Sequence, residues 1–218
     1  MIYEYLKNKY KSELQPFFEG TVCLGPVKVV GKPDKIGIAP GSILCHPSKS
    51  LLTQLLLAND LEREEILSAR KPIEISNGSI IGPYSVIYEG VKISKNVYIE
   101  GRCIIRNNST IRENTSIYFG AYIGENVTVG CRSKIGGFVC NDAIIGNNCA
   151  VLGNLVHCYP QPGLKCREPA PLLKDNVLVS MNANIIGGIV LGDNCRISAG
   201  TTVLKDVSDN NLVNGLHK

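Results

Sequence analysis

Histidine is scarce in this sequence, and one of its histidines stands where the regular pattern of the chain breaks down. The 218 residues contain three histidines, His46, His157 and His217. A neutral imidazole can take a proton from an amine or a hydroxyl, because its pKa lies near the operating pH. His157 stands at the start of the proline-rich stretch 154–176, and we expect it to be a general base. His46, in LCHPSK, is the second candidate.

Three further polar residues have types suited to holding a polar acceptor. Asn141 and Asp142, in GGFVCNDAIIG, stand where the repeat described below slips by ten residues instead of twelve. An irregularity of this kind often redirects side chains near a site. Tyr118, beside Phe119, is the third. The competing interpretation of these residues is an outer face that contacts only solvent.

A six-residue repeat supplies the elements that must position these side chains. Every sixth residue from Ile75 to Ile135 is Ile or Val, over eleven consecutive positions. The pattern resumes at Ile145 and again at Leu173, and then runs to Val203. A period of six fits neither a helix nor a plain strand. It predicts short strands joined by sharp turns, with three units closing a coil of about 18 residues. Eleven uninterrupted matches argue against an ordinary β-sandwich.

The residue two places before each repeated aliphatic is usually small or β-branched, such as Ser85, Cys103 and Ala121. Both residues should point inward, because alternate side chains of a strand share a face. On a strict count His157 is six residues after Val151, so a structural histidine in the core is the alternative to a catalytic one. Four prolines between 160 and 171 favour a loop instead, because proline cannot donate to a strand ladder.

The sequence pattern divides the chain into an N-terminal cap, the coil and a C-terminal tail. Residues 1–72 are predicted to form a helical and irregular cap with a degenerate early coil, in which Leu24 and Val30 are six apart. Within it, 2–18 should form an amphipathic helix that ends before Pro16, and 48–70 one or two helices, with Asn59 or Asp60 as a cap. Residues 73–209 should form the coil with its extended loop 154–176, and 210–218 a C-terminal tail. The cap covers the open end of the coil or contributes to an acceptor pocket.

Composition excludes several classes of protein. The net charge of +4 is too small and dispersed for a nucleic-acid binder. No apolar run approaches the roughly 20 residues that span a bilayer, and the N-terminus has no secretory pattern. Nine cysteines without a C-x-x-C pair predict reduced, packed thiols instead of a zinc ribbon. We therefore expect a cytoplasmic protein with no membrane or nucleic-acid partner and no metal.

The C-terminal coils resemble the hexapeptide-repeat acyltransferase family. The stretch KDNVLVSMNANIIGGIVLGDNCRISAGTTVLKDV is similar to the last coils of galactoside, maltose and xenobiotic acetyltransferases and to the end of serine acetyltransferases. The resemblance implies an all-β solenoid, a left-handed parallel β-helix, that assembles as a homotrimer. It also implies acetyl-CoA as acyl donor, bound in a groove between subunits. The sequence departs from the family pattern at Lys174, Leu178 and Ser180, where the family has Gly, Trp and Gly.

Residue roles follow from the same resemblance. His157 corresponds to the histidine that activates the acceptor. Ser180, Ala199 and Gly200 would line the pantetheine arm of CoA, and Lys205, in TTVLKDV, would meet a phosphate. The expected reaction is acetyl transfer to an amine or hydroxyl of a small polar acceptor, such as an amino sugar, a sugar nucleotide or an amino-acid derivative.

Two other functions fit the same fold. One is a non-catalytic scaffold or regulatory subunit, in which the coil serves as an assembly platform. The other is a γ-class carbonic anhydrase, which needs three histidine ligands for zinc at each subunit interface. The sequence argues against the second, because its three histidines are isolated from one another.

Overall fold

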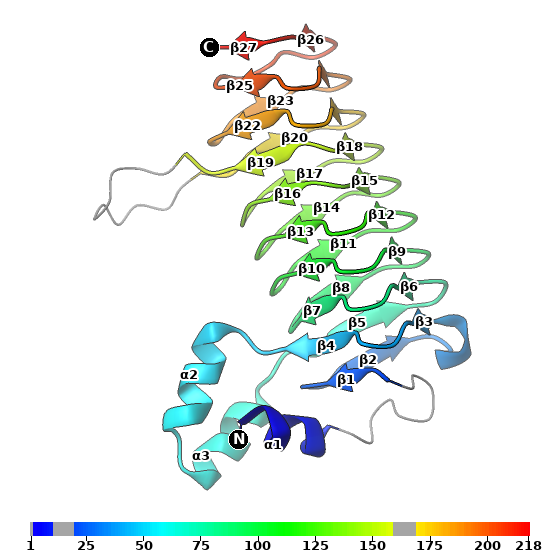
Figure 1. Ribbon diagram of the computed structural model, residues 1–218, viewed down its shortest axis with the longest axis vertical. Coiled ribbons are helices and arrows are strands. Elements are labelled where there is room, and N and C mark those ends of the chain that lie inside the picture. Colours follow the sequence, from blue (N-terminus) through cyan, green and yellow to red (C-terminus); the bar gives the residue numbers. More distant parts are fainter. Residues whose placement is uncertain (1, 11–19, 159–168) are drawn as a thin grey trace.

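Short strands wind into a three-sided parallel β-helix, capped at one end by helices (Figure 1). The computed structural model describes residues 2–10, 20–158 and 169–218. Within them the chain runs repeatedly from sheet A to sheet B to sheet C, and every pair of neighbouring strands is parallel. The fold class expected from the repeat and the family resemblance is confirmed.

Each sheet forms one side of the prism. Sheet A contains β1 (Val22–Cys23), β4 (Ile43–His46), β7 (Val86–Tyr88), β10 (Ile104–Ile105), β13 (Tyr122–Ile123), β16 (Phe138–Val139), β19 (Asn154–Val156), β22 (Asn184–Ile186), β25 (Thr202–Val203) and β27 (Leu216–His217). Sheet B contains β2 (Val27–Val30), β5 (Ile73–Ser76), β8 (Lys92–Ile93), β11 (Thr110–Ile111), β14 (Thr128–Val129), β17 (Ile144–Ile145), β20 (Leu172–Leu173) and β23 (Val190–Leu191). Sheet C contains β3 (Gly37–Ile38), β6 (Ile80–Ile81), β9 (Tyr98–Ile99), β12 (Ser116–Ile117), β15 (Lys134–Ile135), β18 (Ala150–Val151), β21 (Leu178–Val179), β24 (Arg196–Ile197) and β26 (Leu212–Val213).

The core is the column of aliphatic residues that the repeat predicts. Ile81, Ile87 and Ile93 each have at most 1% of their surface exposed, and the same holds through Ile135. Each buried aliphatic side chain contributes on the order of 1.5–3 kcal/mol. Because successive coils stack the same residue types, the core is continuous along the whole prism.

Small polar residues inside the corners tie each coil to the next. The hydroxyl of Ser85 donates to the carbonyl of Glu100 at 3.0 Å, and that of Ser109 to the carbonyl of Gly124 at 2.7 Å. The Cys103 thiol makes the same contact with the carbonyl of Tyr118 at 3.1 Å. Burial raises the pKa of the Cys103 thiol to about 11, so it remains a neutral donor. A small hydroxyl or thiol is favoured here because the corner leaves little room and offers carbonyl acceptors.

The slip in the repeat comes from two short corners. After Ile135 the next inward residue is Val139, and after Val151 it is Leu155; both are fully buried. Each of these corners therefore has four residues from one core position to the next instead of six. Glycine is required there: a Cβ on Gly137 would lie 1.8 Å from the carbonyl oxygen of Gly153.

The first coil uses a different phase from the one expected. Cys23 pairs with Leu44, and Val29 pairs with Ile75, so Cys23 and Val29 take the inward positions. The expected pair was one residue later, at Leu24 and Val30, and Val30 is 41% exposed. A shift of one residue moves a side chain to the opposite face of a strand. Pro33–Lys35, a 3₁₀ turn, follows this strand.

Among the described residues, three α-helices cover the N-terminal end. The described part of the helix expected over 2–18 forms α1 (Ile2–Lys9), while residues 11–18 lie outside the described residues. Residues 48–70 form two helices, α2 (Lys49–Leu57) and α3 (Asp60–Ser68). Asn59 caps α3 in a capping box with Glu62, as its sequence suggests. At the other end, 212–217 add β26 and β27, so the coil continues beyond residue 209. No helix in the described residues is both long and apolar enough to cross a membrane.

Candidate functional site

Both long insertions leave the coil at the same corner, the one between sheets A and B. Helices α2 and α3 connect β4 of sheet A to β5 of sheet B, and residues 157–171 connect β19 of sheet A to β20 of sheet B. Figure 1 shows the end of β19 on the same side of the coil stack as α2. We call this edge of the prism the A–B corner. Insertions here leave the stacked strands intact, because they replace only a turn.

One position of the A–B corner carries most of the candidate chemistry. It is the second residue after each inward aliphatic of sheet A, where the strand has ended and the chain turns toward sheet B. The strand register stacks these residues coil upon coil. In order along the corner they are Glu89, Asn107, Glu125, Asn141, His157, Gly187 and Lys205.

His157 lies at this corner and not in the core. Leu155 takes the core position and is fully buried, because the short corner at Gly153 advances the register by two residues. His157 follows β19 directly and is partly exposed. The alternative of a histidine sealed inside the prism is therefore wrong.

A groove opens beside the exit of the loop. Its volume is 620 Å³, and it is lined by Cys158 and by residues 186–189 and 204–206. We call it the loop-mouth groove. Lys205 and Asp206 supply its charges, and Cys158 is exposed. It therefore combines one cation with two glycines, Gly187 and Gly188, which have no side chains of their own.

Two glycines shape the floor of this groove. Gly187 has a φ of +91° and donates its N–H to the carbonyl of Val156 at 2.9 Å. A Cβ on Gly188 would lie 2.4 Å from Cβ of Pro169, where the chain returns to the coil. Neither glycine was predicted to be a site residue. Their signal was the pair GG at a corner position that is polar in the other coils from Glu89 to Lys205.

Asn141 and Asp142 lie one coil before His157 and support the corner itself. The Asn141 side-chain oxygen accepts from the N–H of Glu125 at 2.9 Å. The Asp142 carboxylate accepts from the Asn126 amide at 3.2 Å, and its backbone has a φ of +62°. These contacts give both residues a structural role beside the candidate base.

The other candidates lie at a different edge, the corner between sheets C and A. Tyr118 follows β12, Ser180 follows β21, and Ala199 and Gly200 follow β24. Ser180 and Ala199 are on neighbouring coils, since the Ser180 N–H donates to the carbonyl of Ile197. Ala199 and Gly200 are exposed, and a Cβ on Gly200 would meet nothing within 4 Å. Within one chain the candidate site is thus divided between two edges.

A second cavity lies nearer the helices and was not expected. It has a volume of 670 Å³ and is bounded by α2, α3 and the A–B corner from Glu89 to Glu125. We call it the helix–corner pocket. Its polar wall contains Arg70, paired with Glu89 at 3.1 Å, and Arg106, paired with Glu125 at 2.6 Å. Each pair is 19 residues apart, one coil plus one residue, and this spacing was the sequence signal for it.

His46, the second-choice base, lies on the outer face of sheet A away from the loop. Its ring centroid is 4.5 Å from that of Tyr88 and 5.7 Å from that of Tyr3. Burial lowers the pKa of His46, which keeps the imidazole neutral. Its Nδ1 lies 2.8 Å from the carbonyl of Pro47. These contacts describe a packed side chain and not one that faces a substrate groove.

Comparison with known proteins supports the repeat assignment. Residues 171–205 match the family described as bacterial transferase hexapeptide (six repeats). The bifunctional protein GlmU of Baumannia cicadellinicola is 27% identical over 64% of this chain and 25% of its own length. GlmU of Streptococcus uberis is 29% identical over 78% of this chain and 34% of its own length. The chain thus spans a quarter to a third of these curated relatives.

Solved structures with a similar arrangement were also found. PerB from Caulobacter crescentus, solved with CoA and GDP-perosamine, is 15% identical with a TM-score of 0.38, over 79% of this chain and 66% of that one. The UDP-N-acetylglucosamine O-acyltransferase LpxA of Moraxella catarrhalis is 15% identical with a TM-score of 0.37, over 89% and 66%.

The stacked strands, the repeat and the matched coils define a parallel β-helix built from hexapeptide units. Residues 171–205 carry the hexapeptide repeat described for bacterial transferases, and a larger part of the chain is similar to the GlmU proteins.

Proposed function

We propose that this chain is a CoA-dependent acyltransferase that moves an acetyl group from acetyl-CoA to an amine or hydroxyl of a small polar acceptor. The observation that carries the proposal is the position of His157. It stands outside the prism, where the chain leaves the coil, two coil positions from Lys205 in the same column. At about 4.8 Å per coil the two residues are about 10 Å apart along the corner.

The chemistry needs little from the protein beyond alignment and one proton transfer. A thioester brings an activated acyl group, so its carbonyl carbon can be attacked directly by a lone pair of the acceptor. His157 takes the proton that the acceptor nitrogen or oxygen loses as the new bond forms. The carbon–sulfur bond then breaks, and the proton can pass from His157 to the departing thiolate. Electrons and protons balance without a metal or a redox partner.

The groove supplies the remaining functions in this proposal. The Lys205 ammonium would bind a phosphate of CoA as a point charge. The backbone N–H of Gly188, which borders the groove, would stabilise the oxyanion of the tetrahedral intermediate. Cys158 borders the groove and would contact the acceptor or the arm of CoA.

A homotrimer would bring the two edges together. Ser180, Ala199 and Gly200 lie at the C–A corner, and His157 and Lys205 at the A–B corner. If flat sides pack around a threefold axis, the C–A corner of one subunit can face the A–B corner of the next. The pantetheine arm would then lie between subunits, against the small exposed residues Ala199 and Gly200. We place the enzyme in the cytoplasm, where thiols remain reduced.

The test is a thiol-release assay with acetyl-CoA and a panel of amino sugars, sugar nucleotides and amino acids. We expect one acceptor class to support turnover and His157→Gln to lower kcat by about 10² to 10⁴-fold, the usual contribution of a general base. The matched control is His46→Gln, which should retain activity. Turnover at the normal rate in His157→Gln would remove His157 as the base. Lack of CoA binding in calorimetry would favour the non-catalytic scaffold instead.

A further inference from the structure

The sequence contains the dipeptide Asn–Gly twice, and the fold places the two copies in different surroundings. Asn77–Gly78 follows β5 of sheet B, and Asn214–Gly215 joins β26 to β27 at the C–A corner. In an Asn–Gly pair the backbone nitrogen of glycine can attack the side-chain carbonyl carbon of asparagine, because glycine adds no side chain that would obstruct it. The contacts of these two groups decide whether this reaction proceeds in the folded protein.

The backbone nitrogen of Gly215 is open to solvent. Asn214 and Gly215 are both exposed, and a Cβ on Gly215 would meet nothing within 4 Å. The Gly215 N–H donates no hydrogen bond to the residues that the structure describes. An amide nitrogen becomes a nucleophile only after it loses its proton, and water can reach this proton directly. The nucleophile is therefore available without any opening of the fold.

A serine of the neighbouring coil contacts the other reacting group. Ser198 lies directly beside this corner, since its N–H donates to the carbonyl of Val213 at 3.0 Å. Its hydroxyl donates to Oδ1 of Asn214. Negative charge develops on this oxygen when a nitrogen attacks the amide carbon, and a hydrogen-bond donor in place at such an oxygen lowers the barrier. The corner thus combines an uncovered nucleophile with a polarised carbonyl.

The other Asn–Gly pair has its nucleophile occupied. The Gly78 N–H donates to the carbonyl of Lys35 at 2.7 Å. Oδ1 of Asn77 accepts from the N–H of Lys32 at 2.8 Å, and a Cβ on Gly31 would lie 2.2 Å from that oxygen. The Asn77 amide is therefore packed against the first coil. Attack at Asn77 requires that the Gly78 hydrogen bond breaks and that the amide leaves this position.

We propose that Asn214 is a site of spontaneous deamidation, with water as the co-reactant. The Gly215 nitrogen loses its proton and forms a bond to Cγ of Asn214. The bond from Cγ to the side-chain nitrogen breaks, and that nitrogen takes up a proton and leaves as ammonia. Water then opens the resulting succinimide ring at one of its two carbonyls, which gives aspartate or isoaspartate. The net change is one water consumed and one ammonia released, without an oxidant or a reductant.

Both products alter the last strand of the described coil. Val213 pairs with Ile197 and His217 with Val203, so this corner passes from one inward position to the next in four residues. Isoaspartate adds one carbon to the backbone of this short corner and should displace β27 from β25. Aspartate adds a negative charge beside Ser198. The site is independent of the acetyl transfer proposed above.

Peptide mapping by mass spectrometry tests the proposal. The intact protein is incubated in mildly alkaline buffer, and fragment spectra of its tryptic peptides locate each amide that has become an acid. We expect Asn214 to react at least about tenfold faster than Asn77, a factor that the hydrogen bond of Gly78 accounts for. The rate at Asn214 should rise with pH, because the attacking nitrogen must lose a proton. In guanidinium chloride the two sites should react at similar rates, since unfolding removes the contacts of both.

Variants at Ser198 separate the carbonyl contact from the openness of the corner. Ser198→Ala removes the donor and should slow deamidation of Asn214 severalfold, whereas Ser198→Thr keeps a hydroxyl and should retain the rate. His157→Gln should react like the unmodified chain, which separates this site from the proposed acetyl transfer. The proposal is wrong if folded protein keeps the Asn214 amide while the denatured chain loses it. It is also wrong if Asn77 reacts as fast as Asn214 in the folded protein.

Discussion

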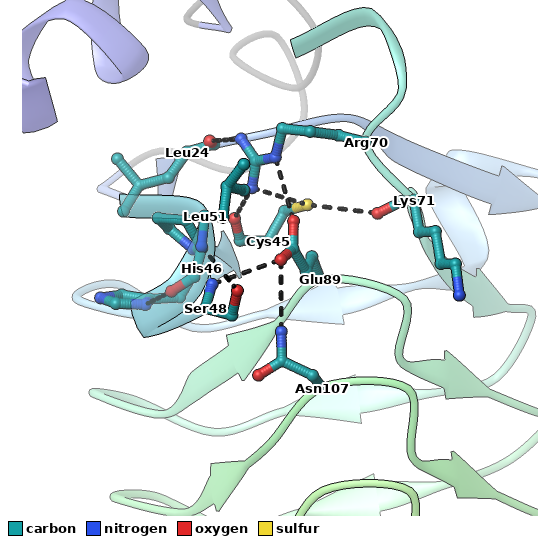
Figure 2. A network of polar contacts seen from close by, with 10 residues as sticks. Leu24, Cys45, His46, Ser48, Leu51, Arg70, Lys71, Glu89 and Asn107 are labelled. Carbon is teal, nitrogen blue, oxygen red and sulfur yellow. Dashed lines mark hydrogen bonds and ion pairs between the residues drawn. The ribbon is translucent and has the colours of Figure 1, made fainter. Parts of the chain in front are cut away.

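At the scale of single residues, Arg70 connects the helical insertion to the coil. It follows α3 and reaches back to the carbonyl of Leu24 in the first coil and that of Cys45 in the second (Figure 2). Gly25 makes room for it, since a Cβ there would lie 2.5 Å from the guanidinium carbon. A buried arginine is tolerated because the two carbonyls and the Glu89 carboxylate accept hydrogen bonds from its guanidinium. Without the arginine, these buried acceptors would lose that donor.

Replacement of Arg70 should therefore destabilise the protein strongly. Arg70→Met keeps most of the volume but leaves Glu89 without its cation and the carbonyls of Leu24 and Cys45 without the Arg70 donors. We expect a loss of about 3–5 kcal/mol in the free energy of unfolding, the usual cost of breaking a buried pair. Urea denaturation followed by circular dichroism measures it.

The control is Lys28→Ala, which breaks an exposed pair with Glu74 at 3.3 Å. Its expected cost is about 0–1 kcal/mol. Equal losses in the two variants would show that the burial of Arg70 does not matter. Arg70→Met combined with Glu89→Leu should recover part of the loss, because the second change removes the unpaired charge.

At the scale of elements, the sequence predicted what repeats and missed what interrupts the repeat. Ile75 to Ile135 was predictable because each coil places the same residue type at the same inward position. Val139 and Leu155 were missed, since glycines at 136, 137 and 153 allow corners that are two residues shorter. The inward positions of the first coil were predicted one residue too late. The reason is that Leu24, on the outer face, is also buried, with only 4% of its surface exposed.

The candidate site followed the same rule. His157 was found because prolines mark the interruption, but its location outside the core depends on Leu155 and could not be read from a strict six-residue count. The helix–corner pocket was missed because residues from three elements form it. Pairing between Arg70 and Glu89, or Arg106 and Glu125, requires knowing that residues 19 apart lie on adjacent coils.

The close packing of Pro169 against Gly188 leads to a prediction about the loop. Gly188→Ala would place a Cβ 2.4 Å from Cβ of Pro169 and push the returning chain away from β22. We expect a stability loss of about 1–3 kcal/mol, as for other overpacked sites, and a larger loss in kcat/KM than the stability change explains. Gly37→Ala is the control, because its Cβ would meet Ile80 at an ordinary 3.5 Å. An unchanged kcat/KM in Gly188→Ala would show that the position of the loop does not affect activity.

At the scale of the whole molecule, the prism separates two sets of candidate residues by one full side. His157 and Lys205 stand at the A–B corner, whereas Ser180, Ala199 and Gly200 stand at the C–A corner. Sheet A lies between the two corners, so a single small molecule cannot contact both sets within one chain without crossing that face. The proposed trimer removes this separation, because different subunits can supply the two corners of one site.

A shared site predicts complementation between two inactive variants. His157→Gln removes the base at the A–B corner, and Ala199→Trp fills the exposed C–A corner. Co-expressed in equal amounts, they should form mixed trimers in which about a quarter of the interfaces combine two intact corners, so activity should return to about a quarter of the unmodified level. Thiol release by the purified mixture measures it. His157→Gln with Cys158→Trp is the control, since both changes affect the A–B corner and no interface escapes both. Recovery in neither mixture would mean that each site is built within one subunit. Recovery in the control would mean that the A–B corner of one of its variants still functions, and this would contradict the prediction.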